Sequence, residues 1–379
     1  MDKVQKLIIS VAFLIVIGAG LCANIQNACV SEEPLHDLVH GVPFKTPFIG
    51  VNGAYERLLG KEIVIDIDKS HNVIKMENDY LLFPCAPYPQ DENAASLNAL
   101  YKFSAANNMD FLYIQTPYKI DKYAPKTPRY VLDAANSNAD DLIAKAGSTP
   151  VFDLRDEVYK DNLLYENLFF KTDHHWTPET ALWAGQKIIE KLNVLYPEYQ
   201  FDSSKIDFEN YEIEKYKDTY LGSQGKRTGR YYVGLDDFNA VVSSGNEQYE
   251  VYVPTIDCRV TGTFSEVLYN REMASSKDFY ENNNYQAYMA IGDGTGLQEI
   301  RNLSNPDGPK CILYRDSFAS AVLPFLIPYF GEIDLVDLRY YQDLNLNAYI
   351  LQKKPDLIMV MYNPDLLGWH VPFDFFSAM

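Results

Sequence analysis

The chain has 379 residues, of which 47% are hydrophobic, so it is long enough for one large globular domain or two smaller ones. Its formal net charge of -19 argues against a nucleic-acid partner, because neutralising phosphates requires a surplus of Lys and Arg. The same charge disfavours attachment to an anionic membrane surface by electrostatic attraction alone.

An apolar run extends from Leu7 to Ala23 near the N-terminus. Its length of about 17 residues lies at the boundary between the core of a signal peptide and a short membrane span. We therefore expect residues 1–23 to be a signal peptide or a membrane anchor, followed by a linker at 24–48. The protein is then expected to be extracytoplasmic, either membrane-anchored or secreted.

From residue 49 to residue 379 the sequence predicts one α/β domain, because helical patterns alternate with short apolar strands. The expected helices lie at 94–106, 139–146, 178–192, 319–326 and 346–352, the second of them capped by Ser137 or Asn138. The expected strands lie at 62–68, 111–114, 151–155, 311–314, 333–338 and 356–361. Strands at this spacing, with helices between them, predict a parallel sheet flanked by helices.

The composition changes between about 201 and 309, where Tyr, Gly, Asn and charged residues alternate. We interpret this region as a strand-rich insertion in the catalytic domain. The run Gly292-Asp293-Gly294-Thr295-Gly296 lies inside it, and no P-loop Lys follows, so a hairpin turn is the better interpretation than a phosphate site.

An acid and two imidazoles stand together at Asp173, His174 and His175. They follow the apolar run 168–170, which predicts a strand, and precede a helix start with Thr177 as N-cap. In an extended segment Asp173 and His175 point to the same side, so the carboxylate can orient the imidazole and leave its other nitrogen free as a base. For either His alone, a packing or capping role is the alternative.

Ser317 lies where the expected strand 311–314 turns into the helix 319–326. Catalytic groups in open α/β sheets gather at the carboxyl ends of strands, and such a turn exposes a Ser hydroxyl. We expect Ser317 to be a nucleophile, His175 its general base and Asp173 the group that fixes the imidazole tautomer. A simple helix N-cap is the alternative for Ser317 alone.

Three further polar residues follow the ends of expected strands, namely Arg339, Tyr362 and Asn363. Arg339 or Asn363, together with the Ser317 N–H, are candidates for binding an oxyanion. Taken singly, each of the three is better explained as a polar residue that closes a strand.

The segment Thr172–Thr177 resembles the signature of the bacterial DHHW proteins, which are similar to the SGNH-type alginate O-acetyltransferases. The resemblance covers roughly residues 50–370. Asp316-Ser317-Phe318 resembles the nucleophile block of that group, in which an Asp-x-His pair precedes the Ser. The resemblance implies an SGNH-hydrolase-like fold and a triad of Asp173, His175 and Ser317.

By position, Arg339 and Tyr362 or Asn363 resemble the oxyanion and substrate-binding blocks of the same group. Arg315 stands where its nucleophile block has Gly, so the Arg315 side chain either crowds the oxyanion hole or supplies a charge to it. The resemblance also implies a polysaccharide substrate and a membrane-bound O-acyltransferase as acetyl donor.

The leading hypothesis is an exported serine-dependent O-acyltransferase or acetylesterase acting on a cell-envelope or secreted polysaccharide, without a cofactor. A non-catalytic carbohydrate-binding or assembly protein with the same fold is the alternative, motivated by Arg315 and the Tyr-rich insertion. A metal phosphoesterase would need more Asp-rich motifs than Asp66 and Asp68, and no Cys pair has metal-ligand spacing. Palmitoyl transfer through an Asp-His-His-Cys motif is excluded because Trp176 cannot carry an acyl group.

Overall fold

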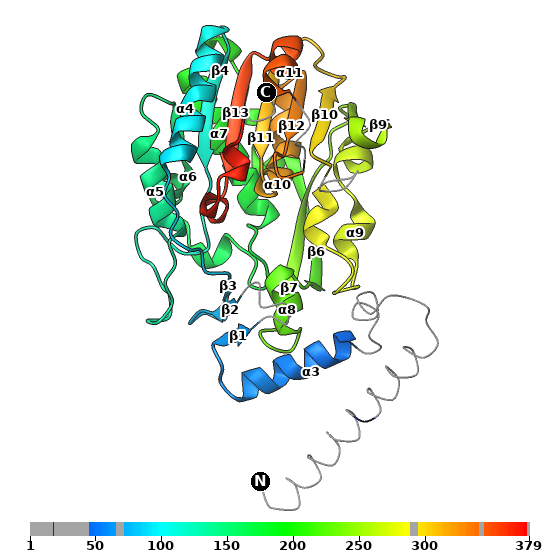
Figure 1. The fold of residues 1–379 in the computed structure, drawn as a ribbon. Coiled ribbons are helices and arrows are strands. Elements are labelled where there is room, and N and C mark those ends of the chain that lie inside the picture. Colours follow the sequence, from blue (N-terminus) through cyan, green and yellow to red (C-terminus); the bar gives the residue numbers. More distant parts are fainter. Residues whose placement is uncertain (1–17, 19–44, 66–71, 289–294, 341–344, 377–379) are drawn as a thin grey trace, which may run out of the picture.

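The computed structural model describes residue 18 and residues 45–65, 72–288, 295–340 and 345–376 (Figure 1). The expected signal or anchor segment, most of the linker, the pair Asp66 and Asp68, and the first three residues of the Gly292–Gly296 run lie outside these residues. Within them, no helix combines the length and the apolar character that crossing a membrane requires.

An eight-stranded sheet runs through the centre of the protein. Its strands, in spatial order, are β5 (Val151–Asp153), β4 (Asp110–Gln115), β13 (Leu357–Tyr362), β11 (Lys310–Arg315), β12 (Glu332–Val336), β10 (Leu297–Asn302), β8 (Tyr249–Val253) and β9 (Cys258–Gly262). All six residues of β13 are buried, as expected of a central strand covered on both faces.

The five strands from β5 to β12 are parallel, as the sequence predicts. The expectation of a purely parallel sheet is nevertheless wrong, because β10, β8 and β9 pair antiparallel at one side of it. These three strands come from the region 201–309, and they extend the sheet by hydrogen bonding onward from β12. The sheet is therefore mixed.

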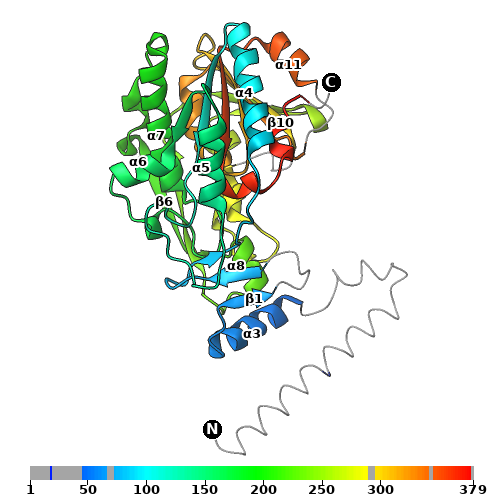
Figure 2. The same cartoon turned by 60° about the vertical axis from the view of Figure 1, so that its left-hand side comes forward.

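Helices cover both faces of the sheet (Figures 1 and 2). On one face α6 (Leu154–Lys160), α7 (Pro178–Leu195) and α10 (Phe318–Leu326) share a hydrophobic core with Leu112, Leu313 and Met359. On the other face α4 (Asp91–Ala106), α5 (Ala135–Lys145) and α11 (Leu346–Lys353) pack with Phe111, Ile312 and Ile358. The two sets of strand residues alternate along the chain, because successive side chains of a strand point to opposite faces.

The remaining elements lie below the carboxyl ends of the parallel strands in the view of Figure 1. They comprise α3 (Lys45–Leu58), a small sheet of β1 (Ile63–Ile65), β2 (Asn72–Lys75) and β3 (Leu81–Leu82), α8 (Ser223–Thr228), α9 (Arg271–Ser275) and the ribbon of β6 (Tyr211–Tyr220) with β7 (Asp236–Ser243). The region 201–309 therefore contributes β6 to β10, in keeping with its strand-rich sequence.

Three local expectations need correction. The run 168–170 is not a strand, and only Phe169 forms a bridge, to Trp176. Helix α5 begins earlier than expected, because the Asp133 carboxylate accepts from the Ala135 N–H at 3.0 Å while Asn138 is used elsewhere in the fold. Strand β5 stops at Asp153, whose side chain caps α6.

Helix α7 packs closely against α10, the helix that begins beside Ser317. The predicted packing face of α7 is buried, and Gly185 lies at the closest approach of the two helices. A Cβ at position 185 would lie 3.3 Å from Cβ of Phe325 and 2.9 Å from Cδ1 of Ile206. The absence of a side chain at Gly185 therefore allows α7 to pack directly against α10.

We predict that Gly185→Val destabilises the protein by about 1–3 kcal/mol, because a branched side chain would force the two helices apart. Urea unfolding followed by circular dichroism measures this change. Glu190→Ala, at an exposed position of the same helix, is the control and should stay within about 0.5 kcal/mol. Equal midpoints for Gly185→Val and the unsubstituted chain would contradict the close packing.

Candidate active site

The loop that carries Asp173, His174 and His175 is held in place by β7. The carboxylate of Asp236 accepts from the N–H groups of Lys171 and Thr172, at 2.8 and 2.7 Å, and from the Thr172 hydroxyl at 2.6 Å. The loop is thus fixed by a side chain from the region 201–309 and not by pairing as a strand. This bent backbone still brings Asp173 and His175 together.

Three side chains that the sequence singles out meet in one hydrogen-bonded chain. Nδ1 of His175 lies 2.5 Å from Oδ1 of Asp173, and Nε2 of His175 lies 2.7 Å from Oγ of Ser317. Because an ionised carboxylate can only accept, Nδ1 carries the proton and Nε2 is left to accept from the Ser317 hydroxyl. Asp173 and His175 are buried, whereas Ser317 is half-buried.

The second oxygen of Asp173 accepts from the backbone N–H of Ser223, the first residue of α8, at 2.6 Å. Gly222 permits this approach, because a Cβ there would lie 2.1 Å from Cβ of Asp173. Burial acts to raise the pKa of Asp173, but His175, His174 and the Ser223 N–H outweigh it and hold the pKa well below its usual range. Asp173 is therefore ionised at neutral pH.

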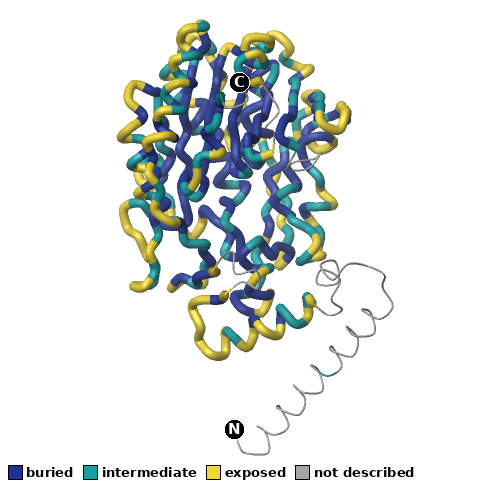
Figure 3. Tube along the Cα trace, in the orientation of Figure 1, coloured by how far each residue is buried: buried dark blue, intermediate teal, exposed yellow. Residues whose placement is uncertain are grey.

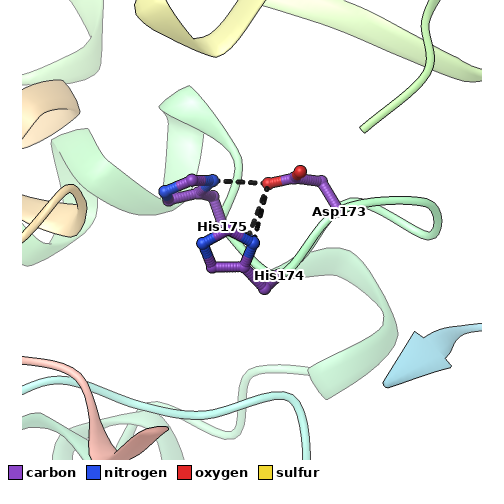
Figure 4. A group of neighbouring side chains, drawn as sticks. All are labelled: Asp173, His174 and His175. Carbon is purple, nitrogen blue, oxygen red and sulfur yellow. Dashed lines mark hydrogen bonds and ion pairs between the residues drawn. The ribbon is translucent and has the colours of Figure 1, made fainter. Parts of the chain in front are cut away.

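Both imidazoles lie beside the same carboxylate oxygen of Asp173 (Figure 4), but each ring also has a partner of its own. Nδ1 of His174 lies 2.9 Å from Oγ of Ser223 and 3.7 Å from Oδ1 of Asp173. Burial, with the neighbouring His175 ring, lowers the pKa of His174 to about 3, which favours its neutral form. His174 bonds to Ser223 and so helps to hold α8 beside Asp173, whereas His175 bonds to Ser317.

Aromatic residues fix the plane of the His175 ring. Tyr285 stacks on it, with ring centroids 3.9 Å apart and an interplanar angle of 16°. Nε1 of Trp176 donates to the Tyr285 hydroxyl at 3.0 Å and to the Phe318 carbonyl at 3.2 Å. Trp176 thereby ties the loop to the start of α10. Tyr285 and Ser223 could not be predicted as site residues, because nothing in the local sequence connects either of them with the Asp173 loop.

Ser317 is the N-cap residue of α10 by position, but its side chain forms no capping hydrogen bond. The neighbouring Asp316 accepts from the Phe318 N–H instead, at 2.8 Å. The simple capping alternative for Ser317 is therefore wrong, and its hydroxyl is directed to His175 at the carboxyl end of β11.

Asn363 and Tyr362 lie at the end of β13, but other groups bind their side chains. Nδ2 of Asn363 donates to Asp316 at 2.7 Å, so this amide supports the turn before Ser317. The Tyr362 hydroxyl donates to the Pro372 carbonyl at 2.5 Å, and its ring packs in the core on the face of the sheet opposite to Phe318 and Tyr285. The expectation that the Tyr362 side chain binds an oxyanion or substrate is therefore wrong.

Asp337 binds both candidate arginines. Arg339 donates to its two oxygens at 2.9 and 2.6 Å, and Nη1 of the buried Arg315 lies 3.6 Å from it. Arg315 is therefore a buried side chain directed to Asp337, which it shares with Arg339, and not a loose side chain that crowds Ser317. Burial lowers the pKa of His174 and raises the pKa of Asp316, and the positive charge of Arg339 acts to lower both.

Two groups of side chains bring potential metal ligands within 4.8 Å of one another in the described part of the chain. One is Asp173 with His174 and His175, whose donor atoms bond to each other and to Ser223 and Ser317. The other is Glu299, Glu332 and Asp334, where the Lys353 ammonium lies 2.6–3.1 Å from all three carboxylates. In the first group the side chains are hydrogen-bonded to one another and to two serines, and in the second group the partner of the carboxylates is the Lys353 ammonium.

No protein-family model matches the sequence, and a search of curated proteins gives no match. Among solved structures, PatB1 of Bacillus cereus with a sulfonyl adduct has a TM-score of 0.65 at 18% identity, covering 80% of this chain and 100% of that chain. A DHHW family protein from Eubacterium siraeum has a TM-score of 0.61 at 16% identity, covering 82% of this chain and 96% of that chain.

This chain has the fold of a DHHW family protein. At the level of the fold, the resemblance predicted from Thr172–Thr177 is confirmed. The DHHW fold here comprises a large mixed sheet with helices on both faces, and the residues of the motif lie at the carboxyl end of its parallel part.

We predict that Asp173→Asn lowers the free energy of unfolding at pH 7 and that this deficit narrows in acid. The folded pKa of Asp173 lies below its unfolded value of about 4. Ionised Asp173 therefore stabilises the fold above that pH, and the contribution is lost as the pH falls through the folded pKa. Each unit of difference between the two pKa values adds about 1.4 kcal/mol.

Urea titrations at pH 7 and at pH 3 measure this deficit. Asp307→Asn, at an exposed aspartate, is the matched control and should show no such pH-dependent deficit. A deficit for Asp173→Asn that is equal at both pH values would show that the ionised carboxylate does not stabilise the fold.

Proposed function

We propose that the protein is a serine-dependent O-acyltransferase or acetylesterase that acts on a cell-envelope or secreted polysaccharide. The observation that supports this best is the position of His175, which lies 2.5 Å from Asp173 and 2.7 Å from Ser317. A hydroxyl becomes an effective nucleophile only when an adjacent base removes its proton, and this arrangement supplies that base.

In the first step, Oγ of Ser317 attacks the carbonyl carbon of an O-acetyl donor, and its proton passes to Nε2 of His175. Asp173 stabilises the imidazolium that forms and keeps the ring in position. The tetrahedral intermediate collapses as the donor oxygen leaves with the proton from His175. The product of this step is an acetyl ester on Ser317.

In the second step, the hydroxyl of a sugar or of water attacks the acetyl ester and gives its proton to His175. The bond between the acetyl carbon and Oγ of Ser317 then breaks, and the proton returns to Oγ. A sugar acceptor makes the reaction a transfer, and water makes it a hydrolysis. The same three side chains serve both outcomes.

The negative charge on the carbonyl oxygen needs hydrogen-bond donors in both steps. We assign this role to the backbone N–H of Ser317, which lies at the N-terminus of α10, where the helix dipole favours a negative charge. Arg339 adds positive charge nearby, while the side chain of Asn363 acts indirectly by holding Asp316.

Similarity to PatB1 supports the same proposal, because that protein was solved with a sulfonyl adduct and shares the fold at a TM-score of 0.65. By analogy, we propose that Ser317 is the group in this chain that reacts with a sulfonyl reagent. The proposal also includes a polysaccharide substrate, an extracytoplasmic location and a membrane-bound O-acyltransferase as the acetyl donor.

We predict that Ser317→Ala abolishes the release of p-nitrophenol from p-nitrophenyl acetate, because no hydroxyl remains beside His175. Ser320→Ala is the matched control, since Ser320 lies one turn further along α10 and outside the chain of hydrogen bonds from Asp173 to Ser317. The control should keep at least half of the turnover. Undiminished turnover by Ser317→Ala would exclude the proposed mechanism.

We also predict that phenylmethanesulfonyl fluoride modifies Ser317, with fluoride as the leaving group and the hydroxyl proton passing to His175. Mass spectrometry of the peptide that contains Ser317 detects the adduct. His175→Ala should slow its formation at least about tenfold, in line with the usual contribution of a general base. Absence of the adduct in the unsubstituted chain would favour the alternative, a non-catalytic carbohydrate-binding or assembly protein.

A further inference from the structure

Helix α3 presents large apolar side chains to solvent. Val51, Tyr55 and Leu58 are exposed and recur at intervals of four and three residues, so they form a stripe along one face of the helix. Leu58 has 82% of its surface exposed, and Leu59 directly after the helix is also exposed. A surface helix ordinarily turns such a stripe toward the core, and α3 does the reverse.

The opposite face of α3 is attached to the protein through glycine. Gly50 and Gly53 are the buried residues of the helix. A Cβ at Gly53 would lie 2.2 Å from the Thr228 carbonyl oxygen, so the backbone of α3 rests directly on the end of α8. The helix is therefore held in place without using its apolar stripe.

Strand β1, which follows α3, also exposes large apolar side chains. Ile63 and Ile65 of β1 are exposed, with Ile65 at 69%, whereas Val64 between them is buried. Helix α3 and β1 lie together at the outer end of the molecule in both ribbon views, and Figure 3 shows this end as largely exposed. Large apolar side chains exposed on two consecutive elements at one end of the molecule are typical of an interaction surface.

We propose that this surface, the α3 face (Val51, Tyr55, Leu58, Leu59 and Ile65), lies at the boundary between the headgroups and the acyl chains of a lipid bilayer. The apolar run Leu7–Ala23 precedes it in the sequence, and residues 24–44 between them reach at most about 70 Å. If that run enters a bilayer, lipid would thus lie within about 70 Å of α3.

The composition of α3 also fits an interfacial helix, which carries apolar and aromatic residues on one face and cations around it. Lys45 and Arg57 are exposed basic residues of α3, and Lys61, which follows the helix, pairs with Glu56. A second copy of the chain would bring together two molecules of net charge -19, whereas a bilayer of zwitterionic lipid opposes no such charge.

Helix α8 connects the α3 face with the candidate active site. Its first residue, Ser223, bonds to Asp173, and its last residue, Thr228, contacts α3 at Gly53. Helix α8, with six residues, is about 9 Å long, and α3 with its side chains is about 10 Å across, so docking of α3 would hold Asp173 within about 20 Å of the lipid surface. This inference concerns attachment alone and stands whether or not Ser317 is a nucleophile.

The experiment uses the full chain with vesicles of phosphatidylcholine or of its dibrominated form, which quenches tryptophan at the depth of the acyl chains. Leu58→Trp reports on the α3 face, and Val194→Trp on α7, at a position 75% exposed, is the matched control. The signal is the tryptophan emission of each variant in excess of that of the unsubstituted chain, which has three Trp.

We expect the excess emission of Leu58→Trp to fall at least twofold in the brominated vesicles and that of Val194→Trp to stay unchanged. Equal emission of Leu58→Trp in both kinds of vesicle would overturn the proposal, and concentration-dependent dimerisation in that case would assign the α3 face to a second copy. Failure of the full chain to float with the vesicles would overturn it as well.

Discussion

The site depends on the hydrogen bonds that the buried carboxylate of Asp173 accepts. A buried charge is tolerated only where hydrogen bonds replace its lost hydration, and here one oxygen accepts from His175 and the other from the Ser223 N–H. The fold delivers these donors from separate places, since α8 provides Ser223 and Asp236 of β7 shapes the loop. Loss of any of these supports would leave an uncompensated charge beside His175.

Charges elsewhere at the carboxyl edge of the sheet are compensated locally. Asp337 binds Arg315 and Arg339, and Asp316 accepts from Asn363 and from the start of α10. These contacts hold the turn before Ser317 in place. A preorganised nucleophile and base on a rigid frame is what acyl transfer requires.

Helices α3 and α8 fix the position of the candidate active site relative to the α3 face. One end of α8 lies against Asp173 and the other supports α3, so the exposed apolar stripe and the candidate active site are connected through six residues. If the α3 face lies on lipid, the site works close to the membrane surface. A polysaccharide at the cell envelope and an acetyl donor in the membrane would both be within reach of such a site.

Local chemistry in the sequence was enough to predict Asp173, His175 and Ser317, because the cap at Thr177, the His spacing and the strand-to-helix turn are properties of neighbouring residues. The parallel strands were predictable for the same reason, from short apolar runs. Tertiary structure alone decided that β8 to β10 extend the sheet, that Tyr362 faces the opposite core, and that Ser223 and Tyr285 complete the site. Those outcomes depend on hydrogen bonds and packing between segments far apart in the chain, which no local pattern records.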